Sequence, residues 1–155
     1  GIMEDVMGIL SKQVLSGTGT DWNKLGDPIP AAGYYGRTSG LHTMAFTLRN
    51  FVGRIYVLAT LENTIADADK NNGWFPIHIG GNDNSPWIEF PPVYAPGTGL
   101  YGVQTSGTFC ETFFGNFMYI RAGMDRDYLK DSSKSEITPA DKQSVGSLES
   151  ILVSY

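Results

Sequence analysis

The amino-acid sequence predicts an all-β fold, an antiparallel sandwich or barrel of about eight strands. Short runs alternate apolar and polar residues at period two, and they recur between turn-forming residues at a spacing of roughly 8–12 residues. The composition suits strands joined by tight turns, with 19 glycines, 12% aromatic residues and only 17% charged residues. No such run alternates with a long helical pattern, so a parallel α/β sheet is not expected.

The length of 155 residues suits one domain that covers 1–155. A chain of this size buries roughly 68–70% of its unfolded surface, which is enough for one hydrophobic core. Within this domain we expect an N-terminal arm at 1–12, an irregular segment at 125–146 and a terminal strand at 147–155.

The first segment, 2–10, carries apolar residues at mixed three- and four-residue spacings. It predicts either a short amphipathic helix or an apolar arm that packs on a neighbouring subunit. A short strand begins at Gln13. The segment 21–36 is expected to be a loop or a sheet edge, because Pro28 and Pro30 cannot donate to a sheet ladder.

Two alternating runs, 43–48 and 54–61, form the clearest strand pattern. A short turn that contains Gly53 joins them, which is typical of an antiparallel hairpin. Further strands are predicted from alternating runs at 74–79, 87–90, 101–105, 109–114, 117–122 and 148–155.

The charge and cysteine content exclude several classes of protein. Eleven basic residues against 16 acidic residues give a net charge of −5, whereas a nucleic-acid-binding protein needs a basic surface. This charge also disfavours anionic lipid, and no apolar run of roughly 18 residues is present to span a membrane. Cys110 is the only cysteine, so we expect no intrachain disulfide, assembly in a reducing cytosol, and a buried, inert thiol.

No catalytic constellation is predicted, and we expect the protein not to be an enzyme. The only histidines are His42 and His78, and the sequence has neither a Gly-x-Ser-x-Gly elbow nor a nucleotide-binding glycine motif. Carboxylates such as Glu89 and Glu111 are interpreted as outward-facing members of alternating strands, with a glycosidase-type pair as the alternative.

One short motif suits calcium. Asp67, Asp69 and Asn71 offer oxygen atoms at alternating positions, as calcium-binding loops do. An EF-hand loop counted from Asp67 would need glycine at the position of Asn72 and glutamate at that of His78, so the match is partial. The alternative interpretation is a solvated hairpin loop, and no other cofactor is predicted.

Several aromatic residues fall in or beside predicted loops, where they can stack on sugar rings or anchor a protein interface. The alternative is that they close the ends of the sandwich. The candidates for a sugar-binding platform are Trp74, Trp87, Tyr94 and Tyr101.

Three segments in the middle of the chain carry a resemblance to known proteins, namely GRIYVLATL at 53–61, NGWFPI at 72–77 and GNFMYIRA at 115–122. Their order resembles that in discoidin-like, galactose-binding-type sandwiches, which are similar to many structural proteins of tailed bacteriophages, including cyanophages. The resemblance covers 43–123. It implies a jelly-roll or galactose-binding-like sandwich and a role in assembly or adhesion, and it supplies no catalytic residues.

We therefore expect a non-catalytic virion structural protein of a tailed phage, as a decoration, neck, baseplate or fibre component assembled in the host cytoplasm. The alternative is a carbohydrate- or receptor-binding module that recognises a cell-surface glycan. The expected partners are other virion proteins and further copies of the chain, with neither nucleic acid nor membrane. Terminal apolar residues are the expected interface, namely Ile2, Val6, Ile9, Leu10, Ile151 and Val153.

Overall fold

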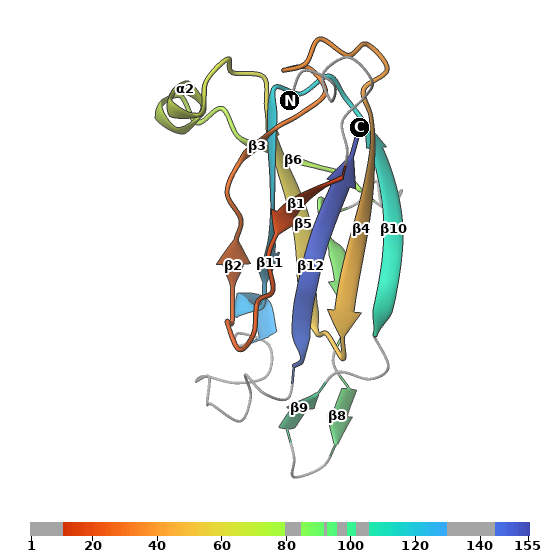
Figure 1. Ribbon diagram of the computed structural model, residues 1–155. Helices are drawn as coiled ribbons and strands as arrows, with labels where there is room; N and C mark the ends of the chain where they lie inside the picture. Colours follow the sequence, from red (N-terminus) through yellow and green to blue (C-terminus); the bar gives the residue numbers. More distant parts are fainter. Residues whose placement is uncertain (1–10, 80–84, 92, 96–98, 102–105, 130–144) are drawn as a thin grey trace.

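The computed structural model describes residues 11–79, 85–91, 93–95, 99–101, 106–129 and 145–155. Two antiparallel sheets pack face to face, so the predicted all-β sandwich is confirmed (Figure 1). The described residues contain ten strands in these sheets and two more in a separate hairpin. The sequence pattern indicated about eight, because strands of two or three residues are too short to show an alternation.

Sheet A has four strands. They lie in the order β1 (Lys12–Leu15), β12 (Ser147–Ser154), β4 (Leu41–Arg49) and β10 (Gly107–Phe114).

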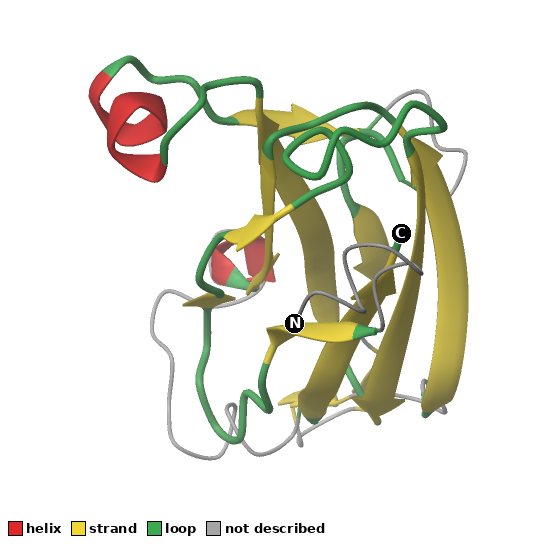
Figure 2. Cartoon of the chain, turned by 45° about the horizontal axis from the view of Figure 1, so that its top comes forward, coloured by secondary structure: helices red, strands yellow, loops and turns green. Residues whose placement is uncertain are grey.

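Sheet B has six strands, four of which form a continuous path. The path runs through β2 (Lys24–Leu25), β11 (Tyr119–Asp125), β5 (Gly53–Thr60) and β6 (Phe75–Ile77), while β3 (Ile29–Pro30) pairs with β11 and β7 (Ile88–Phe90) with β5. A separate hairpin is formed by β8 (Val93–Ala95) and β9 (Gly99–Tyr101). The helix α2 (Ile65–Lys70) projects from one corner (Figure 2).

The core lies between the two sheets and follows from the period-two alternation of the long strands. In β4 and β5 every second side chain is buried, as the sequence predicts. Each fully buried Val, Leu, Ile, Phe or Met side chain contributes about 1.5–3 kcal/mol relative to exposure. Such residues in this core include Met44, Phe46, Leu48, Phe51, Ile55, Val57, Ile120, Met124, Leu148, Ile151 and Val153.

Consecutive long strands change sheets and do not form hairpins. β4 belongs to sheet A and β5 to sheet B, so the hairpin predicted over 43–61 is wrong. Their connection carries Phe51 and Val52, both fully buried, and this apolar pair draws the chain across the end of the core. β10 and β11 also change sheets, through a crossing where the Gly115 N–H donates to the Gly40 carbonyl oxygen at 2.9 Å.

β12 lies inside sheet A, between β1 and β4, so it is not an exposed joint. Ile151 and Val153 are 0% and 1% exposed. A bulge at Glu149 shifts the alternation, so that Leu148 joins the buried face and Leu152 turns outward. The prediction that Ile151 and Val153 contact a partner is wrong, because both side chains are enclosed between the sheets.

Other predicted features lie outside the described residues. These are the interface candidates Ile2, Val6, Ile9 and Leu10 of the predicted arm, and 130–144 of the segment predicted to be irregular.

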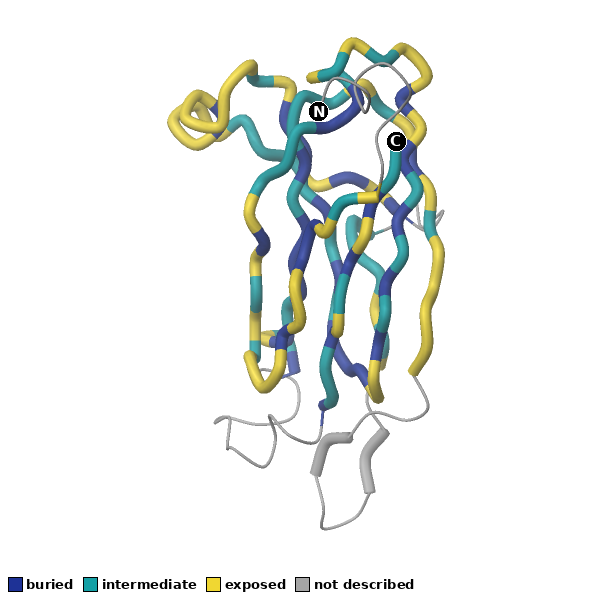
Figure 3. The backbone as a smooth tube through the Cα atoms, in the orientation of Figure 1, coloured by how far each residue is buried: buried dark blue, intermediate teal, exposed yellow. Residues whose placement is uncertain are grey.

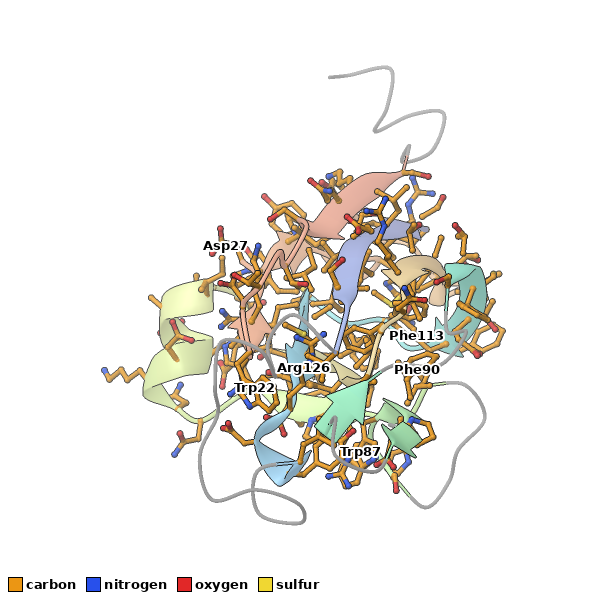
Figure 4. All side chains as sticks on the ribbon, turned by 90° about the horizontal axis from the view of Figure 1, so that it is seen from below. Trp22, Asp27, Trp87, Phe90, Phe113 and Arg126 are labelled. Carbon is orange, nitrogen blue, oxygen red and sulfur yellow. The ribbon has the colours of Figure 1, made fainter. Side chains whose placement is uncertain are left out.

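Arg126 connects three loops at one end of the sandwich. Its fully buried guanidinium donates to the carbonyl oxygens of Val52 at 2.6 Å, Asp21 at 2.9 Å, and Val145 and Gly146 at 3.0 Å each. Burial lowers the pKa of Arg126 to about 10, so it is charged at neutral pH. Figure 4 looks at this end from below and shows Arg126 near its centre.

Candidate functional site

A cleft of about 470 Å³ lies on the outer face of sheet B. In β5, Ile55 and Val57 enter the core, so Arg54 and Tyr56, which alternate with them, face outward. β7 pairs with the same part of β5, and Trp87 directly precedes β7. The described lining residues are Asn23, Lys24, Leu25, Arg54, Tyr56, Pro76, Pro86, Trp87, Met124 and Asp125.

Arg54 is held rigidly in one wall of this cleft. Its guanidinium carbon lies 4.5 Å from the ring centroid of Trp87 and 3.9 Å from that of Tyr128. Its Nε donates to Glu89 Oε1 at 2.8 Å. Burial and then the Glu89 carboxylate raise the pKa of Tyr128 to about 12, so that this phenol stays neutral. The stack fixes the orientation of Trp87, which lines the cleft.

Tyr56 forms the floor of the cleft, above Gly123 on the neighbouring strand. A Cβ atom at Gly123 would lie 2.6 Å from the Tyr56 hydroxyl oxygen, so only glycine lets this ring lie flat. Burial, followed by the Asp125 carboxylate, raises the pKa of Tyr56. The cleft thus combines aromatic surface with polar side chains from Asn23 and Asp125, a combination that suits a sugar ring, while the Lys24 ammonium donates to Ser16 Oγ and the Gly17 carbonyl oxygen.

Trp74 and Trp87 of the predicted aromatic platform do not form one surface. Trp74 and Trp87 precede strands that pair with β5 at Ala59 and Ile55, four residues apart, which is about 13 Å along a strand. Trp74 Nε1 donates to Asp69 Oδ1 at 2.9 Å, so Trp74 belongs to the corner with α2.

The backbones of Tyr94 and Tyr101 belong to the β8–β9 hairpin, where they pair with Leu100 and Val93. Their side chains lie outside the described part of the chain.

The segment predicted to be a calcium-binding loop forms the helix α2. Thr64 caps α2 by accepting a hydrogen bond from the Asp67 N–H at 3.1 Å, which turns the predicted loop into helical backbone. Asp67 and Asp69 then point about 200° apart around the helix axis, and Asp69 is bonded to Trp74. The ligand arrangement predicted for calcium, which includes Asn71, is therefore wrong. In the described residues no group of three or more His, Cys, Asp or Glu side chains is placed to hold a metal.

The outer face of sheet A forms a second candidate surface, which we call the threonine face. It consists of the outward side chains of β4, β10 and β12, and charges occur only at one end, where Arg49 and Glu149 lie 3.7 Å apart. Among the described residues, the face consists of Leu41, Thr43, Ala45, Thr47, Thr108, Cys110, Thr112, Phe114, Ser150, Leu152 and Ser154.

β10 is the edge strand beside this face and is exposed along most of its length (Figure 3). Cys110 is exposed there, so the prediction of a buried thiol is wrong. The prediction failed because the aromatic neighbours of Cys110 indicated a core strand, whereas Phe109 is 42% and Phe114 is 71% exposed.

His42 has a structural role inside sheet A. It is fully buried and stacks on Phe113, with ring centroids 4.6 Å apart. Its Nδ1 lies 2.9 Å from the Gly40 carbonyl oxygen, and its Nε2 accepts from the Ala32 N–H at 3.4 Å. Burial lowers the pKa of His42, so the imidazole is neutral. With no serine or carboxylate bonded to it in these contacts, His42 does not form a hydrolase triad.

The sequence interpretation missed Arg54 and Tyr56 in the cleft, and it missed the threonine face. The alternation itself carried the signal, because the residues between the predicted core positions of β4 and β5 must face outward. Reading both faces of each alternating run would have found these surfaces.

Comparison with known proteins adds no assignment to these surfaces: no protein-family model, no curated protein and no solved structure matches the chain. In the described residues no helix is both long and apolar enough to cross a membrane. The resemblance to galactose-binding-type phage proteins stays a prediction.

Proposed function

We propose that this protein is a non-catalytic structural subunit that assembles through the threonine face and the adjacent edge of β10. The single observation that carries the proposal is an exposed sheet face that lacks charge outside one end, in a chain of net charge −5. Interface cores are depleted of charged residues, because burying a charge without a partner is costly. Exposed Phe114 and Leu152 add apolar surface at two places on this face.

A role in the virion of a tailed phage is the context we propose for this assembly. It is supported by the sequence resemblance over 43–123 alone. Mass spectrometry of purified particles from a phage that encodes the chain tests it, and the chain is expected as a component of constant copy number. Its absence from the particles would refute the virion role.

The assembly proposal is tested by a charge placed in the centre of the threonine face. Wild-type protein should associate in a concentration-dependent way in sedimentation velocity, and Ala45→Glu should weaken that association by about tenfold or more. The control is Leu61→Glu, an equivalent change at a 65% exposed side chain outside this face. Equal weakening by both variants, or a wild-type monomer at every concentration, would contradict the proposal.

The second candidate function is carbohydrate or receptor binding, and the cleft on sheet B favours it. Trp87 and Tyr56 would supply the stacking surface there, with Asn23 and Asp125 as hydrogen-bonding groups. A glycan array with wild-type protein would find a ligand that Trp87→Ala loses without a large drop in Tm. Trp74→Ala is the matched control, because Trp74 lies at the other end of β5 and should leave binding intact.

A further inference from the structure

β10 is a long and regular open edge of sheet A. It pairs with β4 residue by residue over its whole length without a bulge, and within the described part of the chain no strand pairs with its other side. Edge strands are usually protected by lysine, proline, a bulge or an inward-pointing charge. β10 has no lysine, proline or bulge, and its only charged residue is Glu111, which stands opposite the buried Met44 on the inner side of sheet A. Its free backbone groups can therefore accept a strand from another chain.

We infer that β10 pairs with β10 of a second copy of this chain, antiparallel and around a two-fold axis perpendicular to the sheet. The inference rests on the proposed function, because it names the partner of the same surface. The dimer joins two four-stranded sheets into one continuous sheet, and both copies use the same contact, as in most homodimers.

The side chains restrict the register of this pair. The two-fold axis keeps every side chain on its own face, so each residue stands opposite one that faces the same way. Two such registers overlap nearly the whole strand, one centred on Cys110 and the other on Glu111. Centring on Glu111 sets two carboxylates directly opposite each other, which destabilises a sheet. The favoured register therefore has Cys110 on the axis.

In this register the strand is complementary to itself. Thr108 stands opposite Thr112, and Phe109 stands opposite Glu111, so the two carboxylates are separated by the axis. The second strand covers part of the Phe109 ring, which is 42% exposed in the single chain. Because Thr108, Cys110 and Thr112 all lie on the outward face, the threonine face continues across the junction of the two copies. These features favour a second copy over an unrelated strand.

The position of Cys110 on the axis allows a direct test. With diamide as the oxidant, two Cys110 thiols lose two protons and two electrons in total and form one S–S bond. The N=N bond of diamide accepts these protons and electrons and is reduced to the hydrazine. A covalent dimer should form on a non-reducing gel and disappear with dithiothreitol. Cys110→Ser should give none.

Two variants test the register in the Cys110→Ser background. Thr108→Cys and Thr112→Cys should each cross-link poorly alone, because neither position stands opposite itself. A mixture of the two should cross-link at least about tenfold faster, because the positions are opposite one another in the pair and proximity raises the effective concentration of the thiols.

The outcomes separate this inference from the proposed function. Rapid Cys110 cross-linking, together with the preference of the mixture, supports the pairing. If wild-type protein associates in sedimentation but Thr112→Cys alone cross-links as fast as Cys110, the pairing is wrong and another part of the threonine face mediates assembly. A wild-type monomer at every concentration would overturn both.

Discussion

The Nε of Arg126 donates to the carbonyl oxygen of Val52 at 2.6 Å, across 74 residues of sequence. Arg126→Met would remove this bond and those to Asp21, Val145 and Gly146, and the buried Val52 carbonyl would lose this donor, whereas the Val145 carbonyl would keep its hydrogen bond from the Val52 N–H. We expect the free energy of unfolding to fall by at least about 3 kcal/mol. Urea denaturation followed by tryptophan fluorescence measures the change.

The matched control is Arg49→Met. The Arg49 side chain is 77% exposed, and its ion pair with Glu149 lies at the surface. This variant should change the free energy of unfolding by no more than about 0.5 kcal/mol. Similar losses in the two variants would mean that the buried bonds of Arg126 do not hold the loops together.

His42 should make the protein less stable in mild acid. Its pKa is lowered by burial in the folded state, so the unfolded chain, with a value near 6.5, binds a proton more readily. The stability that depends on neutral His42 is fully present above pH 6.5. It is lost as the pH falls from there through the lower folded-state pKa, at up to about 1.4 kcal/mol per pH unit. Denaturation between pH 7.5 and 5.5 measures this loss, and His42→Gln should reduce it. An unchanged pH dependence in that variant would contradict the assignment.

Gly146 should be intolerant of any side chain. Its φ is +66°, and a Cβ atom there would lie 2.2 Å from the Arg49 carbonyl oxygen. Gly146→Ala should therefore lower the free energy of unfolding by more than about 2 kcal/mol. Gly36→Ala is the matched control, because Gly36 has φ +71° and open space around it, so it carries only the backbone strain of about 1–2 kcal/mol. Equal losses of stability in Gly146→Ala and Gly36→Ala would mean that the collision of the new Cβ atom with the Arg49 carbonyl oxygen has no effect.

Calcium should have no effect on stability through the segment around α2. Asp67 lies in the first turn of the helix, and the Asp69 carboxylate accepts a hydrogen bond from Trp74. Differential scanning calorimetry should give the same Tm with calcium and with a chelator. A rise in Tm with calcium that is lost in Asp69→Asn would show that this segment rearranges to bind the ion.

The sequence predicted which residues of β4 and β5 are buried, but not which strands are neighbours. The alternation around Phe46 and Val57 is local, and it indicates a buried face wherever the strand lies. Whether β4 and β5 pair depends on the connection between them. The residues Phe51 and Val52 look like a turn in sequence, yet their burial requires the chain to cross to the other sheet.

The candidate surfaces were harder to predict than the core, because they depend on strands that are distant in sequence. Trp87 was found from its residue type. The alternation places Arg54 and Tyr56 on the outer face of β5, but their proximity to Trp87 follows only from the pairing of β7 with β5. Cys110 was predicted to be buried and Ile151 to lie at an exposed interface, and both predictions failed for the same reason. The order of strands in sheet A decides which strand is the edge, and no local pattern contains that order.

The central place of β12 also determines when the protein can fold during its synthesis. β12 lies between β1 and β4, so within the described sheet β1 has no partner until residues up to Ser154 have left the ribosome. Strands that change sheets at each step also bring together distant parts of the sequence, and such topologies fold in milliseconds to seconds. The nascent chain therefore displays its alternating apolar runs before they can be buried, and sheet A is completed only after translation has passed β12.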